Sequence, residues 1–163
     1  MRNKKGNVVA DTLLVVVALF LISVVALLAH SAQESFNTEL QKQDNVDADV
    51  KAYMQDTTDS YARTWDGLFI FCFVLLWIFV FTASFLVDSH PLFFGISLAL
   101  LIFVFTIAGM LGNAFYDIST ADGLAAYALD FPRMSFIMNH IVEFILAVAF
   151  TTCIGLFGKG AFE

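Results

Sequence analysis

Four long apolar runs constrain this chain more than any other feature of its sequence. They cover about residues 8–29, 68–87, 92–115 and 136–157. A helix needs roughly 20 mostly apolar residues to cross the hydrocarbon core of a bilayer. Transmembrane strands would instead alternate apolar and polar residues over about ten positions, and the run "LFIFCFVLLWIFVFTASFLV" does not alternate. The sequence therefore predicts an all-α integral membrane bundle of four transmembrane helices, with residues 1–163 forming a single membrane domain.

The composition agrees and excludes several classes of protein. Hydrophobic residues make up 60% of the chain and charged residues only 14%, whereas soluble domains carry about a quarter charged residues. The net charge of −7 repels phosphate backbones, so we expect no nucleic-acid partner. Both cysteines, Cys72 and Cys153, lie within the apolar runs, and no spacing typical of a metal site, a phosphate loop or a catalytic triad occurs. We expect no cofactor, no metal and no enzymatic activity.

A polar segment, residues 30–66, separates the first two runs and carries much of the negative charge. Its apolar residues recur at spacings of three and four on each side of Asp44-Asn45, which predicts two helical pieces with a break between them. We expect an extended extra-membrane helical hairpin whose thin apolar stripe packs against its own other arm or against a partner. A short interfacial helix is predicted at about residues 120–130, capped by Ser119 or Thr120.

Basic residues set the expected orientation. Arg2, Lys4 and Lys5 precede the first run and Lys159 follows the last, so the positive-inside tendency places both termini in the cytoplasm. An alternative for the first run is a signal peptide cleaved after "AHS", although the run is longer than the usual apolar region of such peptides.

The third run carries small and polar residues on one helical face. They are Gly95, Ala99, Thr106, Gly109 and Asn113. Such a face lets another helix approach closely, so we predict a helix-packing surface there. The second run is crowded with aromatic side chains and is expected to face mainly lipid.

Polar and ionisable side chains at membrane depth are the candidate functional residues. They are Asp11, Asn139, His140 and Glu143. His140 and Glu143 are three residues apart, and two interpretations remain open for them: a hydrogen-bonded helix start within the bundle, or a protonatable pair that lines a pore.

Two resemblances add expectations. The stretch Lys4-Lys5-Gly6 followed by an apolar helix with Asp11 resembles the leader and first helix of type IV prepilins, which implies cleavage after Gly6 and an assembly role for Asp11. The whole layout, from the basic amino terminus to the closing "FPRMSFIMNHIVEF" segment, is similar to small multi-pass membrane proteins of membrane-containing prokaryotic viruses. That resemblance implies a constituent of a virion membrane or an assembly factor.

The sequence thus predicts a non-enzymatic structural or assembly subunit, whose partners are the lipid bilayer and either copies of itself or other membrane proteins. One alternative is a small pore, such as a holin or a proton- or ion-conducting protein, that uses Glu143 and His140. A further alternative is an accessory subunit of a larger membrane complex.

Overall fold

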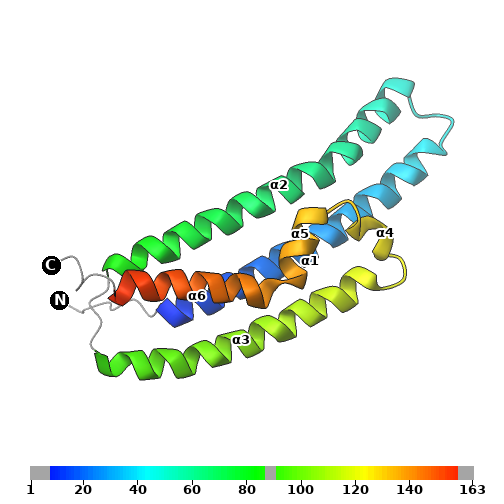
Figure 1. Cartoon of the computed structure of the whole chain (residues 1–163). Helices are drawn as coiled ribbons and strands as arrows, with labels where there is room; N and C mark the ends of the chain where they lie inside the picture. Colours follow the sequence, from blue (N-terminus) through cyan, green and yellow to red (C-terminus); the bar gives the residue numbers. More distant parts are fainter. Residues whose placement is uncertain (1–7, 87–90, 158–163) are drawn as a thin grey trace, which may run out of the picture.

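The computed structural model describes residues 8–86 and 91–157, and this part of the chain is built from helices and short connections without a strand (Figure 1). The helices are α1 (Val8–Gln41), α2 (Ala48–Leu86), α3 (Pro91–Thr120), α4 (Ala125–Ala128), α5 (Pro132–Asn139) and α6 (Ile141–Phe157). The predicted all-α class is therefore confirmed.

The long helices form one elongated bundle with a fixed order of neighbours. α1 contacts α2 and α3, and α6 contacts the same two helices from the other side. Figure 1 shows that α1 begins and α6 ends at the same end of the bundle, and that the α1–α2 pair extends beyond the other helices at the far end. The protein thus has a four-helix half and a two-helix half.

Three described helices are long and apolar enough to cross a membrane: Thr12–Gln41, Ala48–Phe85 and Leu101–Thr120. The pair α5 and α6 qualifies as a fourth span only if both helices are counted together. These lengths are compatible with an integral multi-pass membrane protein.

The fourth apolar run is not a single straight helix. α5 and α6 meet at His140 with a bend of 72°. At this break the backbone N–H of His140 donates to the carbonyls of Phe136 and Ile137, which closes α5 before α6 begins. The run of residues 136–157 that the sequence predicts as one span is thus divided three residues after its start.

The core lies where the four long helices meet. Leu19 and Leu27 of α1 are fully buried, as are Val104 and Phe115 of α3. Within each helix these positions are separated by a near-whole number of helical turns, as expected for hydrophobic side chains that face a common interior. The bundle therefore buries one stripe of each helix.

The prediction that the second run faces mainly lipid is wrong for part of its aromatic side chains. Phe69 and Phe73 are 1% and 4% exposed and belong to the core, whereas Phe71 and Phe79 point outward. Phe73 also packs edge-to-face on Phe144 of α6, with ring centroids 5.4 Å apart. The aromatic side chains of this helix thus face both the core and the outer surface. The sequence does not separate the two groups, because phenylalanine recurs throughout the run.

The connection between α1 and α2, residues 42–47, lies at the predicted break beside Asp44-Asn45. Asp47 starts α2: its side-chain oxygen accepts the backbone N–H of Asp49 at 2.9 Å, and its carbonyl accepts the N–H of Lys51. Both helices run without interruption from the apolar runs into the polar segment, so the arms are continuations of the candidate spans.

The short helix after α3 differs from its prediction. α4 has only four residues, and its first flanking residue, Leu124, makes no side-chain cap. Ser119 and Thr120 lie in the last turn of α3, where both hydroxyls donate to the carbonyl of Tyr116. The predicted capping by Ser119 or Thr120 is therefore wrong, because α3 continues through both residues.

Candidate functional site: a polar junction between the helices

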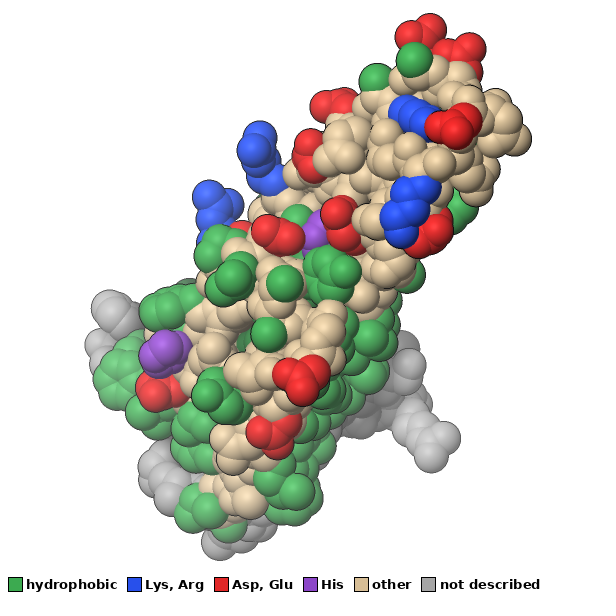
Figure 2. All heavy atoms as spheres, turned by 90° about the vertical axis from the view of Figure 1, so that its right-hand side faces the viewer, with side chains coloured by type: hydrophobic (Ala, Val, Ile, Leu, Met, Phe, Trp, Pro, Cys, Tyr) green, Lys and Arg blue, Asp and Glu red, His purple; other side chains and the backbone are tan. Residues whose placement is uncertain are grey.

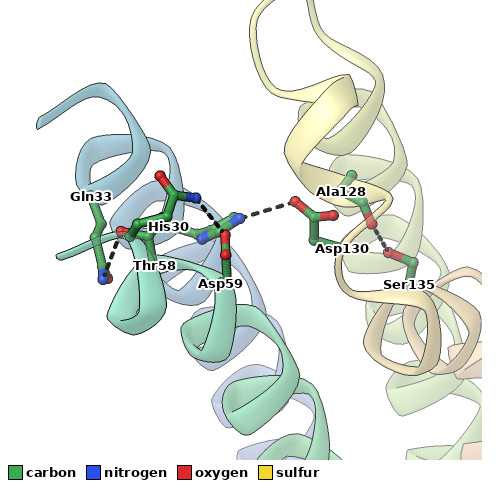
Figure 3. Close-up of polar contacts among 8 residues, drawn as sticks. His30, Gln33, Thr58, Asp59, Ala128, Asp130 and Ser135 are labelled. Carbon is green, nitrogen blue, oxygen red and sulfur yellow. Dashed lines mark hydrogen bonds and ion pairs between the residues drawn. The ribbon is translucent and has the colours of Figure 1, made fainter. Parts of the chain in front are cut away.

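A buried histidine joins the first helix to the segment before α5. His30 of α1 is 4% exposed, and its Nε2 lies 3.0 Å from Oδ2 of Asp130, a residue 100 positions away in the chain. Figure 3 shows His30 reaching from α1 toward Asp130, which lies between α4 and α5. The side chain of Asp130 is about half exposed. This contact closes a loop that includes α2, α3 and α4.

Three aromatic rings enclose the imidazole. Tyr61 of α2 stacks on it with an angle of 3° between the ring planes and 5.7 Å between centroids. Tyr127 and Phe131 meet it edge-on, at 5.7 and 5.4 Å. Aromatic pairs of these geometries stabilise a structure beyond the area they bury. Tyr61 and Tyr127 are thus parts of the His30 surroundings.

A buried acid holds the start of α5. Asp66 of α2 is 4% exposed, and its Oδ1 accepts the backbone N–H of Met134 at 2.8 Å. Its Oδ2 accepts the N–H of Arg133 at 3.4 Å, and the Arg133 Nε lies 3.9 Å away. The first N–H groups of a helix have no partners within the helix, and a carboxylate there also interacts favourably with the helix dipole. Asp66 thus caps α5 from a neighbouring helix.

Hydrogen bonds between polar side chains join the end of α1 to the beginning of α2. The Asn37 amide donates to Gln55 at 2.9 Å, and Asn37 is 2% exposed. Nearer the connection, the Lys51 ammonium donates to the Gln41 carbonyl, while the Gln41 amide donates to the Lys51 carbonyl, both at 3.0 Å. Closer to His30, the Gln33 amide donates a hydrogen bond to the Thr58 hydroxyl at 3.5 Å (Figure 3). The polar segment therefore packs against its own other arm, as one interpretation of its sequence predicts.

A cleft of about 440 Å³ opens beside His30. Its polar and charged lining residues are His30, Glu34, Thr58, Asp59, Arg63 and Asp130. Tyr127 and two alanines complete the lining. Three carboxylates face one guanidinium, so the cleft favours a ligand with positive charge. Among the described residues no group of three or more histidine, cysteine or acidic side chains is arranged to hold a metal ion.

The other nitrogen of His30, Nδ1, is buried without a hydrogen-bond partner among the described residues. If Nε2 carries the proton and donates it to Asp130, Nδ1 is an acceptor with a free lone pair. Buried polar atoms almost always have a partner in native structures. Nδ1 of His30 is an exception to this rule among the described residues.

The residues predicted at membrane depth lie elsewhere, at the α5–α6 break. His140 is exposed, and its Nδ1 lies 2.9 Å from the carbonyl of Phe136 within its own turn. Glu143 is exposed in the first turn of α6, across the break from His140, and among the described residues no hydrogen bond or ion pair joins the two. Asp11 belongs to α1, but its side chain lies outside the described residues.

The predicted packing face of α3 does not form the core of the bundle. Ala99, Thr106 and Asn113 are exposed and Gly109 is half-buried, while the burial of Gly95 lies outside what the structure describes. From residue 101 onward, the buried positions of α3 are instead Val104, Ala108, Gly112, Phe115 and Ser119. The predicted face therefore remains available to a partner outside the chain.

Gly112 is where α3 comes closest to the break. A Cβ at this position would lie 2.9 Å from the Ile141 side chain and 3.2 Å from the Met138 carbonyl. A groove of about 320 Å³ runs beside it, with Asn113 of α3 and Asn139 of α5 among its lining residues. The structure thus brings two predicted residues, Asn113 and Asn139, to one groove.

The sequence analysis misses His30, Asp66 and Asp130. Two of them stand next to an apolar run, since His30 follows Ala29 directly and Asp66 precedes Leu68 by two positions, while Asp130 lies six positions before the run that starts at Phe136. The ends of three antiparallel runs meet at the same level of a bundle, so this placement is the signal that could have found them.

No protein-family model, no curated protein and no solved structure matches this chain.

Proposed function

We propose that this chain is a non-enzymatic integral membrane subunit that assembles with copies of itself or with other membrane proteins. The observation that carries the proposal is the pair of exposed amides, Asn113 and Asn139, in the groove beside Gly109 and Gly112. Asn113 lies within the candidate span Leu101–Thr120, and Asn139 ends the first half of the bent pair. Both amides are on the outer surface of the bundle, at positions that meet lipid or a partner.

Physical chemistry favours the partner. Lipid offers no hydrogen bonds at hydrocarbon depth, so side-chain amides there bond across helices. A carboxamide has donors and an acceptor, so it can pair with the same group on a second copy. The groove between α3 and the α5–α6 break gives a second copy a concave surface beside both amides. Each of these features suits an assembly surface, and none of them depends on enzymatic activity.

The test is the self-association of the protein in lipid nanodiscs or liposomes, measured by energy transfer between labelled copies as the protein is diluted in lipid. We expect the native chain to associate, and Asn113→Leu with Asn139→Leu to weaken association about tenfold, because two interhelical hydrogen bonds are lost. Thr106→Val is the matched control, since the Thr106 hydroxyl is exposed on the same helix but already donates to the Ile102 carbonyl at 3.0 Å. Unchanged association in the double variant would contradict the assembly role of the groove.

A second candidate function is a small pore or a proton- or ion-conducting protein. One observation favours it: His140 and Glu143 are exposed at the break, where an assembled ring of copies could place them along a path. Ionisable side chains within a membrane often mark ion pathways. Flux through liposomes under an imposed gradient tests this function, with Glu143→Gln as the variant. Flux that disappears in this variant while the helical content stays constant would favour the pore.

A further candidate, an accessory subunit of a larger complex, predicts co-purifying partners under mild solubilisation and poor stability of the isolated chain. For all three candidates we place the beginning of α1 and the end of α6 on the cytoplasmic side, supported by the basic residues near both termini. Labelling of single introduced cysteines by a membrane-impermeant reagent tests this orientation.

A further inference from the structure

We propose that the cleft beside His30 binds a phospholipid headgroup in which a primary ammonium stands next to a phosphate. This inference rests on the membrane placement in the proposed function, and it assigns a ligand to a part of the molecule that the assembly surface does not use. It follows from the position, the size and the charges of the cleft.

The position of the cleft matches the headgroup region. His30 follows the apolar run of residues 8–29 directly, and Asp130 precedes α5. Figure 2 shows charged side chains concentrated on the α1–α2 extension and hydrophobic side chains on the other half of the molecule. The cleft lies where these two halves meet, at the level that lipid headgroups occupy when the apolar halves of the helices cross a bilayer. Its 440 Å³ is within the range of small-molecule sites.

The charges of the lining suit a zwitterion. Glu34, Asp59 and Asp130 supply carboxylates for an ammonium, and Arg63 supplies a guanidinium for a phosphate. Asp59 already accepts one bond, from the Gln55 amide at 2.8 Å, and Asp130 accepts one from His30. Each carboxylate can accept several further bonds, because an ionised carboxyl group has about four acceptor positions. No ion pair of Arg63 occurs among the described residues, so its guanidinium is available to the phosphate.

Hydrogen bonding to the carboxylates distinguishes a primary ammonium from a methylated one. Glu34, Asp59 and Asp130 line the cleft as acceptors, together with His30 and Tyr127. A primary ammonium carries three N–H donors, whereas a trimethylammonium carries none. We therefore expect ethanolamine headgroups to bind better than choline headgroups, and purely anionic headgroups to bind least because the lining has an excess of negative charge.

The experiment measures lipid binding to the full chain in mild detergent by native mass spectrometry. The probes are dioleoyl phosphatidylethanolamine, phosphatidylcholine and phosphatidylglycerol. We expect the ethanolamine lipid to bind about tenfold more tightly than the choline lipid, as the loss of charge-assisted hydrogen bonds predicts. The variant Glu34→Gln with Asp59→Asn should remove this preference, while leaving the His30–Asp130 contact in place.

The matched control is Asp44→Asn with Asp49→Asn, which removes the same charge from the far end of the α1–α2 pair and should keep the preference. Soluble glycerophosphoethanolamine separates two sources of the headgroup: displacement of the lipid by this compound means that the headgroup alone is recognised, whereas its failure to compete means that the acyl chains are also needed. Either result supports the site.

Equal binding of the three lipids, or a preference that persists in the cleft variant, would overturn the inference. This failure is distinguishable from failure of the proposed function. A chain that self-associates in bilayers through Asn113 and Asn139 but shows no headgroup preference disproves the lipid site alone. A chain that does not reconstitute into bilayers disproves the membrane placement.

Discussion

The two described histidines of this protein occupy opposite kinds of surroundings. His30 is buried among three aromatic rings and contacts a residue 100 positions away. His140 is exposed at the α5–α6 break, and its ring contacts only its own turn and the Phe136 ring within it, among the described residues. The first histidine joins separate helices, whereas the second closes the end of one.

The difference shows where long-range polar contacts form in a bundle of apolar helices. At the level of His30, α1 and α2 meet Asp130 and the start of α5, so His30 and Asp66 reach side-chain or backbone partners from distant segments. Within the apolar half, polar groups are satisfied mainly by carbonyls of their own helix, as in Ser23, Ser84 and Thr152. We therefore expect the junction to contribute more to stability than the break.

The largest difference is expected between His30→Ala and His140→Ala. The first variant removes a buried ring and leaves a cavity, and it should lower the free energy of unfolding by about 3 kcal/mol. The second removes an exposed ring and should change it by less than about 0.5 kcal/mol. Denaturant titration in detergent, followed by circular dichroism, measures both. Equal losses would remove the distinction between the two regions.

A smaller loss, about 2 kcal/mol, is expected for Asp66→Ala, because two N–H groups at the start of α5 lose their acceptor. Asp66→Asn keeps an oxygen acceptor and should lose less. Glu143→Gln, at the first turn of α6, is the control for removal of an acid near a helix start. It should be nearly neutral, since Glu143 is exposed and accepts no hydrogen bond among the described residues. A larger loss from Glu143→Gln than from Asp66→Ala would reverse the order of the two regions.

Glycine substitutions sharpen the comparison at the break itself. Gly112→Ala places a methyl group 2.9 Å from the Ile141 side chain and 3.2 Å from the Met138 carbonyl. Overpacking of this kind should cost about 1 kcal/mol. Gly67→Ala is the matched control, because a Cβ there meets nothing within 4 Å and the helix propensity improves, by about 0.5 kcal/mol or more. Thermal unfolding of both variants should therefore move in opposite directions, and a shift in the same direction contradicts the close approach at Gly112.

A small loss is expected for Trp77→Phe, which removes the hydrogen bond from the indole N–H of α2 to the Thr151 hydroxyl of α6 at 3.0 Å. Interhelical hydrogen bonds in membrane proteins contribute about 0.6 kcal/mol on average. Thr151→Val tests the same bond from the other side. Combining the two variants should add little to either alone, and a fully additive double variant would mean that the two side chains act separately.

Much of the architecture is predictable from the sequence because hydrophobic length and period are local signals. The four apolar runs, the break at Asp44-Asn45 and the packing of the two arms on each other follow from them. The bend at His140 does not, because no proline or glycine interrupts residues 136–157 before Gly155. Its cause is tertiary: Asp66 fixes the start of α5, and the Met138 carbonyl and Ile141 pack on Gly112.

The candidate site is less predictable for a related reason. Sequence reasoning favours ionisable residues deep in a span, so it selects Asp11, His140 and Glu143. The polar junction consists of His30, Asp66 and Asp130, which lie at the ends of runs and resemble ordinary surface residues until the helices are placed side by side. Three selected residues, Gly109, Asn113 and Asn139, lie in one groove.

The α1 helix is longer than the hydrocarbon core of a bilayer is thick. Its 34 residues measure about 51 Å at 1.5 Å per residue, while the hydrocarbon core is about 30 Å thick. The α1 helix is therefore about 20 Å longer than that core is thick, and its connection to α2 carries Asp44 and Asp47. If the apolar run of α1 crosses a bilayer as proposed, this extra length would keep a partner at the tip at a fixed distance from the membrane surface.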